Sequence, residues 1–179
     1  MNKIKLSKLV SYILRHKPEE YDTTLDNEGW VDISDLIKQI TCRHNIYDGI
    51  DINIFQEITQ TSGKQRFEIK ANRIRAFYGH SIEAKIAREK TSPPDVLYHG
   101  TPIVTATIIL QDGMKAMNRQ NVHLSSDENT AEIVAKRWHS EYKILKVDAK
   151  RAFKDGINFY EGNESIWLAD FIPHQYIKE

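Results

Sequence analysis

The chain has 179 residues, with 25 Lys and Arg side chains against 25 Asp and Glu, so its formal net charge is zero. This length suits one large domain or two small lobes, and the even charge argues against a protein that binds polyanions in bulk. A single cysteine excludes a disulfide framework and a cysteine metal cluster. The sequence has no apolar run near the ~20 residues of a membrane span and no signal-peptide core, so we expect a cytoplasmic protein without a membrane partner.

Positive charge is nevertheless concentrated in two segments. Residues 1–17 hold five basic side chains and no acidic one, and residues 64–90 hold eight basic side chains against three acidic ones. Both segments could be solvated basic faces, or together they could form one surface that binds phosphate groups. The charge pattern by itself leaves these two alternatives open.

The first third of the chain predicts three helices. Apolar residues at helical spacing over residues 6–14 predict the first helix, and Pro18 ends it because residues before proline avoid helical backbone angles. Asp32 or Ser34 is the predicted N-cap of the second helix. Isoleucines on one side of residues 49–60 predict the third.

A β-hairpin follows the helices. Residues 66–69 and 74–77 alternate between apolar and polar side chains, and Ala71-Asn72 lies between them as a turn. Arg66 opens the first strand of this hairpin. Three helices followed by a hairpin is the element order of a winged-helix domain, and this is the organisation that we expect for the first half.

The second half of the chain has a different pattern of predicted elements. Ser92-Pro93-Pro94-Asp95 is the predicted linker between the halves. Beyond it we expect a mixed α+β lobe with short strands. The predicted elements are strands at residues 96–98, 123–125, 143–147 and 166–168, a helix over 103–110 that closes near Gly113, and a helix capped by Asp127 or Thr130 that runs through Val134 and Arg137.

The pair Arg15-His16 directly follows the first apolar stripe, at or beyond the end of the first helix. An arginine in this place interacts favourably with the helix dipole, and that role alone would explain it. Alternatively, the planar guanidinium binds phosphate oxygens, and the neighbouring imidazole donates to the same phosphate or moves a proton near neutral pH. The pair is therefore a candidate phosphate site.

Other polar residues occur beside predicted strands and helices, namely Arg66, Gly79-His80-Ser81, His99-Gly100-Thr101, His123, Ser125 and Arg137. A glycine allows a ligand to lie against the backbone, and its neighbours supply polar contacts. Each of these residues also has an ordinary explanation as part of a turn or as a surface side chain. The sequence has no GxGxxG, P-loop, HExxH or Cys-x-x-Cys motif and no nucleophile elbow, and its histidines are not spaced as a metal site, so no metal is expected.

Taken together, these pieces resemble the RNA 2′-phosphotransferase family (the KptA type) over nearly the whole chain. Each piece is weak alone, but the ordered set is specific. The pieces are Leu14-Arg15-His16-Lys17-Pro18, Gly29-Trp30, Arg66-Phe67-Glu68-Ile69, Ile74-Arg75-Ala76 with Gly79-His80-Ser81, Tyr98-His99-Gly100-Thr101, His123-Leu124-Ser125, Arg137 and Ile166-Trp167-Leu168.

The resemblance implies an α+β fold with a winged-helix RNA-binding lobe at residues 1–91 and an ADP-ribosyltransferase-like NAD-binding lobe at residues 92–179. NAD would be the co-substrate of a monomeric transferase, and the partner would be tRNA-like RNA that bears a 2′-phosphate. The implied catalytic set is Arg15, His16, Arg66 and Arg137. The implied phosphate-binding set is Arg15, His16, Arg66, Arg75, His80 and Ser81, and the implied NAD-binding set is His99, Gly100, Thr101, His123 and Ser125.

The resemblance also implies a reaction in two steps, in which NAD first ADP-ribosylates the RNA 2′-phosphate and the phosphate then leaves as ADP-ribose 1″,2″-cyclic phosphate. Two alternatives remain. One is an ADP-ribosyltransferase that caps terminal phosphates of RNA or DNA. The other is a non-enzymatic winged-helix regulator that binds nucleic acid.

The chain departs from the family pattern at several positions. Phe77-Tyr78 stands where the family usually has Asn-Gln, and Ala135 replaces a usual glycine. Trp138-His139 and Glu164-Ser165 also differ from the usual residues. These changes spare the four charged residues of the catalytic set, so they bear on substrate preference more than on reaction type.

Overall fold

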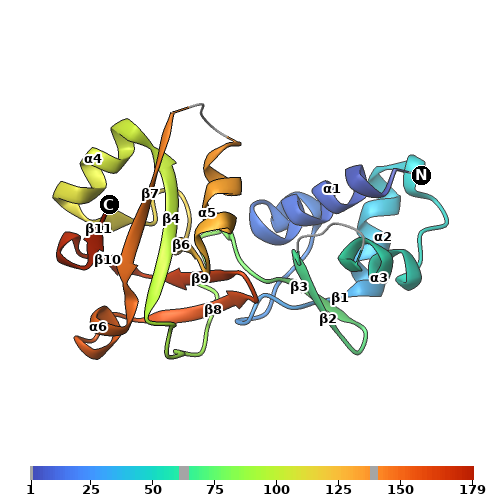
Figure 1. Ribbon diagram of the computed structural model, residues 1–179. Helices are drawn as coiled ribbons and strands as arrows, with labels where there is room; N and C mark the ends of the chain where they lie inside the picture. Colours follow the sequence, from blue (N-terminus) through green and yellow to red (C-terminus); the bar gives the residue numbers. More distant parts are fainter. Residues whose placement is uncertain (1, 61–64, 138–140) are drawn as a thin grey trace. The chain divides into compact units, whose positions relative to one another are not determined.

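The computed structural model describes residues 2–60, 65–137 and 141–179, so Lys64, Trp138 and His139 lie outside the described residues. The chain divides into two compact units, an N-terminal unit (Met1–Ala87) and a C-terminal unit (Arg88–Glu179), each with an apolar core of its own (Figure 1). The division lies shortly before the predicted linker. Helices and antiparallel sheets make up both units, which confirms the expected α+β class.

The helices of the N-terminal unit agree with the sequence pattern. Helix α1 (Lys3–Arg15) ends at His16, and α2 (Ile33–Arg43) begins at Asp32, whose carboxylate accepts hydrogen bonds from the next N–H groups. Helix α3 (Ile52–Gln60) starts slightly later than predicted. Short 3-10 turns at Pro18–Tyr21 (η1) and Asn45–Tyr47 (η2) connect the helices.

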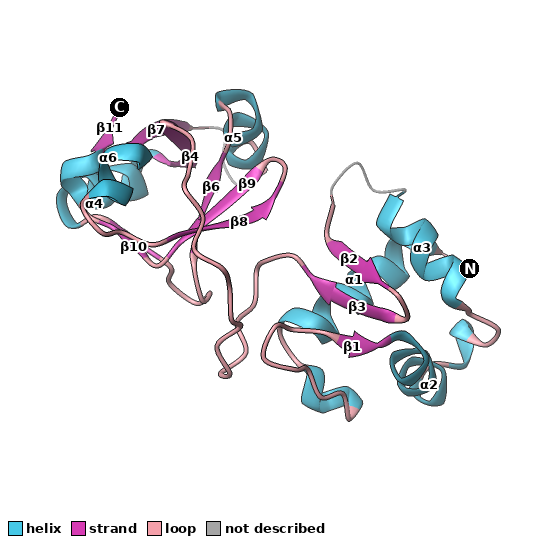
Figure 2. Ribbon diagram, turned by 90° about the horizontal axis from the view of Figure 1, so that it is seen from below, coloured by secondary structure: helices cyan, strands magenta, loops and turns pink. Residues whose placement is uncertain are grey.

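The predicted hairpin is also confirmed. Strands β2 (Phe67–Lys70) and β3 (Arg73–Ala76) pair in antiparallel fashion, and Ala71 adopts a positive φ of 53° in the turn. A two-residue strand, β1 (Val31–Asp32), joins the other edge of β3, so β3 lies between β1 and β2 (Figure 2). The order of helices and hairpin is the one that the winged-helix prediction requires, and the fold assignment itself stays a prediction.

The C-terminal unit is built on a sheet with the strand order β11-β7-β4-β6-β9-β8. Its strands are β4 (Val96–Pro102), β6 (Val122–Ser125), β7 (Tyr142–Asp148), β8 (Phe159–Asn163), β9 (Ile166–Ala169) and β11 (Ile177–Lys178). A separate pair consists of β5 (Met114–Lys115) and β10 (Phe171–Ile172). The sequence predicted β4, β6, β7 and β9 but not β8, nor β5, β10 and β11, whose pairing depends on distant partners.

Three helices and a final 3-10 turn complete this unit. They are α4 (Ile103–Asp112), α5 (Glu128–Ala135), α6 (Ala149–Lys154) and η3 (His174–Tyr176). Helices α4 and α5 lie on opposite sides of β4 (Figure 1). Asp127 caps α5 by accepting from the N–H of Thr130, which decides between the two predicted caps. Among the described helices, none is long and apolar enough to cross a bilayer.

Two of the wrongly predicted boundaries bear on the candidate site residues. Strand β4 extends through Pro102 because it pairs with β7 along its whole length, so the His99-Gly100-Thr101 stretch lies inside the strand and not after it. Helix α5 ends at Ala135, so Arg137 lies beyond the helix and not within it.

Gly100 allows α5 to pack closely on β4. A Cβ atom at this position would overlap the carbonyl oxygen of Ala131 and would lie 2.8 Å from the Cβ of Ala135. Ala135, one of the departures from the family pattern, therefore packs directly against the glycine. Close packing of the helix explains Gly100 without a ligand, and its predicted contact with NAD stays a prediction.

Replacing Gly100 with alanine is expected to lower the free energy of unfolding by about 1–3 kcal/mol, because the added methyl group overpacks the contact between helix and strand. Denaturant unfolding of the full chain measures this change. The control is Val96→Thr, at a 38% exposed position of the same strand, which should change stability by less than about 0.5 kcal/mol. Equal stability of Gly100→Ala and the native chain would contradict the packing argument.

Candidate functional site

The end of helix α1 brings together residues that are distant in sequence. Arg15 is the last residue of α1, and its main-chain oxygen accepts a hydrogen bond of 2.8 Å from the N–H of Ser81. The final carbonyl groups of a helix lack partners within the helix, so Ser81 supplies one from another segment. This bond fixes the segment after β3 against the Arg15-His16 pair.

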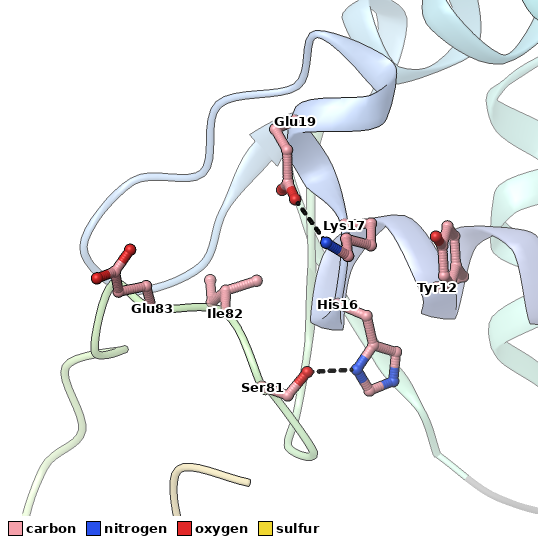
Figure 3. Close-up of a pocket in the computed structure, with 7 residues that line it drawn as sticks. All are labelled: Tyr12, His16, Lys17, Glu19, Ser81, Ile82 and Glu83. Carbon is pink, nitrogen blue, oxygen red and sulfur yellow. Dashed lines mark hydrogen bonds and ion pairs between the residues drawn. The ribbon is translucent and has the colours of Figure 1, made fainter. Parts of the chain in front are cut away.

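The side chain of Ser81 also contacts His16. Its Oγ lies 2.8 Å from Nδ1 of the imidazole, at hydrogen-bond distance. Both residues line a cavity of about 450 Å³ in the N-terminal unit, which Figure 3 shows together with the hydrogen bond. The lining residues are Tyr12, His16, Lys17, Glu19, Ser81, Ile82 and Glu83. An exposed imidazole with a hydrogen bond to Ser81 thus lines this cavity.

Arg66 lies next to the same helix end. It directly precedes β2, where its main-chain oxygen accepts from the N–H of Phe77 at 3.0 Å and from Nη2 of Arg15 at 3.3 Å. Nη1 of Arg66 lies 3.4 Å from Oγ of Ser7, on the buried side of α1. We call Arg15, His16, Arg66 and Ser81 the α1-end cluster. Arg66 joins this cluster through its main chain, while its guanidinium contacts Ser7. Guanidinium, imidazole and hydroxyl groups all bind phosphate oxygens.

His80 and Arg75, two further predicted phosphate contacts, have other surroundings. The side chain of His80 is only 2% exposed, and its Nε2 would lie 3.6 Å from a Cβ atom built on Gly29. Arg75 binds Glu68 at 2.7 Å and lies 3.7 Å from Glu28. Their roles toward a phosphate stay predictions, since both side chains already pack against other parts of the unit.

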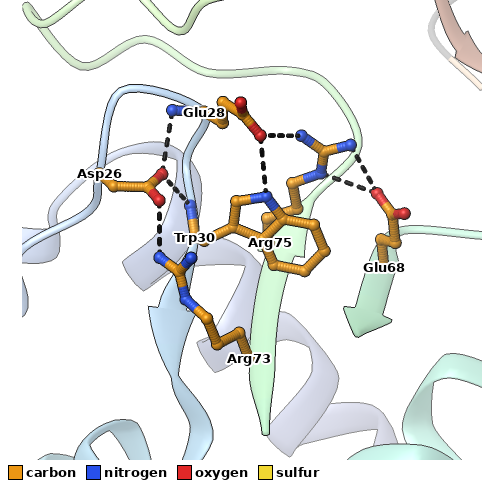
Figure 4. A network of polar contacts seen from close by, with 6 residues as sticks. All are labelled: Asp26, Glu28, Trp30, Glu68, Arg73 and Arg75. Atoms are coloured by element: carbon orange, nitrogen blue, oxygen red, sulfur yellow. Dashed lines mark hydrogen bonds and ion pairs between the residues drawn. The ribbon is translucent and has the colours of Figure 1, made fainter. Parts of the chain in front are cut away.

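The contacts of Arg75 belong to a polar network around Trp30 (Figure 4). The Cζ atoms of Arg75 and Arg73 lie 4.5 Å and 5.8 Å from the indole centroid, within range of cation–π attraction. Arg73 also binds Asp26 at 2.6 Å. Burial raises the pKa of Asp26, but hydrogen bonds from the N–H of Trp30, from Arg73 and from the N–H of Glu28 outweigh it, so the pKa is lowered. Part of the second basic segment is thus neutralised by neighbouring carboxylates.

In the C-terminal unit, the pleat of the sheet divides the predicted NAD-binding residues. Tyr98 pairs with Ser125, and side chains alternate between faces along a strand. His123, Ser125 and Gly100 therefore lie on the face that α5 covers, while His99 and Thr101 lie on the other. The side chains of Thr101 and Ser125 are buried, with 3% and 4% exposure.

His99 connects the two strands beyond the Tyr98–Ser125 pair. Its Nδ1 lies 2.9 Å from the main-chain oxygen of His123. A carbonyl oxygen only accepts hydrogen bonds, so Nδ1 carries the proton. Burial lowers the pKa of His99, against a smaller opposite effect of this hydrogen bond. The ring is therefore neutral near pH 7 and its Nε2 is an acceptor, which suits a hydroxyl donor.

Arg137 lies in the turn that follows α5. Its side chain is exposed, and its main-chain N–H donates to the oxygen of Val134 at 3.3 Å.

In the part of the chain that is described, no group of three or more His, Cys, Asp or Glu side chains is arranged to hold a metal ion.

Comparison with known protein families tests the resemblance. A family model described as "RNA 2'-phosphotransferase, Tpt1 / KptA family" matches residues 1–171. The chain belongs to the RNA 2′-phosphotransferase family. The match covers both units, so the α1-end cluster, His99 and Arg137 all lie within the region that defines the family.

Curated relatives support the same assignment. A protein of Rhizobium leguminosarum bv. trifolii is 44% identical over 172 residues, which is 96% of this chain and 91% of the relative. Proteins of Acetivibrio thermocellus and Bacillus thuringiensis subsp. konkukian are also 44% identical, over 97% and 99% of this chain and 95% and 97% of their own lengths. Each of the three is named "Probable RNA 2'-phosphotransferase".

Sequence reasoning missed one contact of the α1-end cluster. The aromatic ring of Tyr78 lies over the guanidinium of Arg15. Tyr78 was noticed as a departure from the RNA 2′-phosphotransferase pattern, but nothing local in the sequence links it to a residue at the end of the first helix. The available signal was its position directly before Gly79, in the segment that the resemblance had already marked.

Proposed function

We propose that the protein removes an internal 2′-phosphate from RNA, with NAD as co-substrate. The observation that carries the proposal is the family match over residues 1–171 together with the α1-end cluster. In this proposal residues 1–91 form a winged-helix lobe that binds the RNA, and residues 92–179 form an ADP-ribosyltransferase-like lobe that binds NAD. The RNA is tRNA-like, and the enzyme is a cytoplasmic monomer.

The α1-end cluster would bind the RNA 2′-phosphate. In the first step an oxygen of this phosphate attacks the anomeric carbon of the nicotinamide ribose, and nicotinamide leaves with the electrons of the broken glycosidic bond. The nucleophile belongs to the substrate, so the protein supplies positioning and charge rather than a nucleophilic side chain. Arg15 and Arg66 offer two planar guanidinium groups for the phosphate oxygens, and His16 offers a donor that Ser81 orients.

In the second step the ribose 2″-hydroxyl attacks the phosphorus. The bond from phosphorus to the RNA 2′-oxygen breaks, which releases RNA with a free 2′-hydroxyl and ADP-ribose 1″,2″-cyclic phosphate. On the resemblance we assign Arg137 to this step, in which its guanidinium would stabilise the charge that develops on the phosphoryl oxygens. The implied reaction transfers a phosphate without oxidation or reduction.

The C-terminal unit would supply the NAD contacts. The acceptor Nε2 of His99 suits a ribose hydroxyl, and Thr101 lies on the same face of the sheet. His123 and Ser125 lie on the face that α5 covers, and we assign them to NAD on the resemblance alone. The neutral ring fits this task, since an imidazolium would have no acceptor to offer. These residue types are compatible with a nucleotide that presents several hydroxyl groups.

Nicotinamide release tests the proposal. The protein is incubated with NAD and an oligoribonucleotide that carries one internal 2′-phosphate, and with the same oligonucleotide without it. We expect nicotinamide release in equal amount to the 2′-phosphate removed, and none with the control RNA. Accumulation of ADP-ribosylated oligonucleotide on terminal phosphates would favour the capping alternative, and no NAD consumption with any phosphorylated nucleic acid would favour a non-enzymatic regulator.

NAD affinity should depend on pH through His99. The folded-state pKa of His99 is lowered, so its acceptor is fully available above the ordinary value of about 6.5 and is lost as the pH falls through the lowered pKa. The free energy of unfolding changes with pH in the same direction. The neutral ring contributes stability above about pH 6.5 that is lost on acidification. Calorimetric titration with NAD should show constant affinity from about pH 8 to pH 6.5 and weaker binding only below.

The control for this measurement is His99→Gln, which has an amide oxygen as acceptor and does not titrate. Its NAD affinity should lack the fall on the acid side. A titration in the native protein centred at or above the ordinary histidine pKa would contradict the assignment of His99 as the neutral acceptor.

A further inference from the structure

The guanidinium of Arg15 lies against an aromatic ring. Its Cζ is 5.4 Å from the ring centroid of Tyr78, within range of cation–π attraction. Tyr78 follows the end of β3 and is partly buried. The two residues are distant in sequence, so the contact depends on the folded N-terminal unit.

Gly79 forms a second boundary of the same guanidinium. Its φ of +91° is in the left-handed region, which an L side chain rarely adopts. A Cβ atom at this position would lie 3.6 Å from both Cδ and Nη1 of Arg15. The glycine backbone therefore lies close to the arginine, directly after the residue whose ring contacts it.

The main-chain oxygen of Arg66 is a third neighbour of this side chain. It accepts from Nη2 of Arg15 at 3.3 Å. The ring of Tyr78, the backbone of Gly79 and this oxygen together limit the positions of a side chain that otherwise has many rotamers. An arginine held in this way loses less entropy when a phosphate binds to it.

We propose that Tyr78 is a positioning residue that orients the guanidinium of Arg15 for the substrate phosphate. The inference rests on the proposed function, since it assigns a substrate phosphate to Arg15. The inference goes beyond the proposed function because Tyr78 acts through Arg15 and needs no contact with RNA or NAD. The contribution comes from the face of the aromatic ring, so the phenolic hydroxyl is dispensable.

Binding of RNA without NAD tests the inference. The Kd of the full chain is measured for an oligoribonucleotide with one internal 2′-phosphate and for the same RNA without it. Tyr78→Phe keeps the ring and should change both values by less than about twofold. Tyr78→Leu removes the π face at similar bulk and should weaken binding of the phosphorylated RNA by roughly 3- to 10-fold, with the unphosphorylated RNA unaffected.

A double-mutant cycle separates positioning from a general structural role. In an Arg15→Gln background, Tyr78→Leu should have no further effect on the preference for phosphorylated RNA, because the group that it positions is gone. An equal loss in both backgrounds would overturn the inference. Thermal unfolding checks that the variants are folded, and Tyr78→Met, which also lacks a π face, replaces the leucine variant if that one does not fold.

The outcomes also distinguish this inference from the proposed function. If the native protein binds both RNAs equally, the proposed function fails, and the inference fails with it. If the native protein prefers the phosphorylated RNA and Tyr78→Leu retains the whole preference, the inference alone fails.

Discussion

Replacing Arg15 or Arg66 with alanine is expected to lower the rate of 2′-phosphate removal by at least about 10²- to 10³-fold, the usual cost of removing a group that stabilises transition-state charge. Both residues belong to the α1-end cluster, where the main-chain oxygen of Arg66 accepts from Arg15. Single-turnover assays with excess enzyme measure the effect on chemistry.

Two further variants make this prediction specific. Arg15→Lys keeps the charge but loses the planar fork, so most of the activity should still be lost. Arg73→Ala removes another arginine of the N-terminal unit, one that binds Asp26, and should retain activity within a few-fold. Native rates in Arg15→Ala, or an equal loss in Arg73→Ala, would show that the α1-end cluster is not the phosphate site.

Replacing Arg137 with alanine should have a different effect. In the proposed reaction the first step depends on the α1-end cluster and Arg137 acts in the second, so the ADP-ribosylated RNA should accumulate. A slowing of the second step by about 10²-fold would make this intermediate the main species in a single-turnover time course. Gel separation of substrate, intermediate and product RNA measures it.

The neighbouring residue provides the control for Arg137. Lys136 is also exposed, and it binds Glu132 at 2.9 Å. Lys136→Ala should give product without a lasting intermediate. Loss of the first step in Arg137→Ala, or a product time course like that of the native protein, would remove Arg137 from the second step.

The sequence predicted elements whose signals are local. The apolar stripe and Pro18 located the end of α1, and the alternation on either side of Ala71-Asn72 located the β2–β3 hairpin. Strand β1 was not predicted, because two residues carry no pattern and their pairing with β3 depends on the folded unit. Likewise, β4 extends beyond its predicted end because it pairs with β7 along its whole length.

The candidate site was predictable as a set of residues but not as a set of contacts. The resemblance named Arg15, His16, Arg66 and Ser81, and the structure places Ser81 and the main chain of Arg66 beside the end of α1. The resemblance could not reveal that Glu28 and Glu68 bind Arg75, since such pairs are formed by chain segments distant in sequence. The stacking of Tyr78 on Arg15 was invisible for the same reason.

The most direct test of the proposed reaction follows the phosphate itself. An oligoribonucleotide with one radiolabelled internal 2′-phosphate is incubated with the protein and NAD, and the products are separated. The account predicts that the label leaves the RNA and appears in ADP-ribose 1″,2″-cyclic phosphate, with one nicotinamide released for each phosphate. Label recovered as inorganic phosphate, or retained on the RNA while NAD is not consumed, would contradict it.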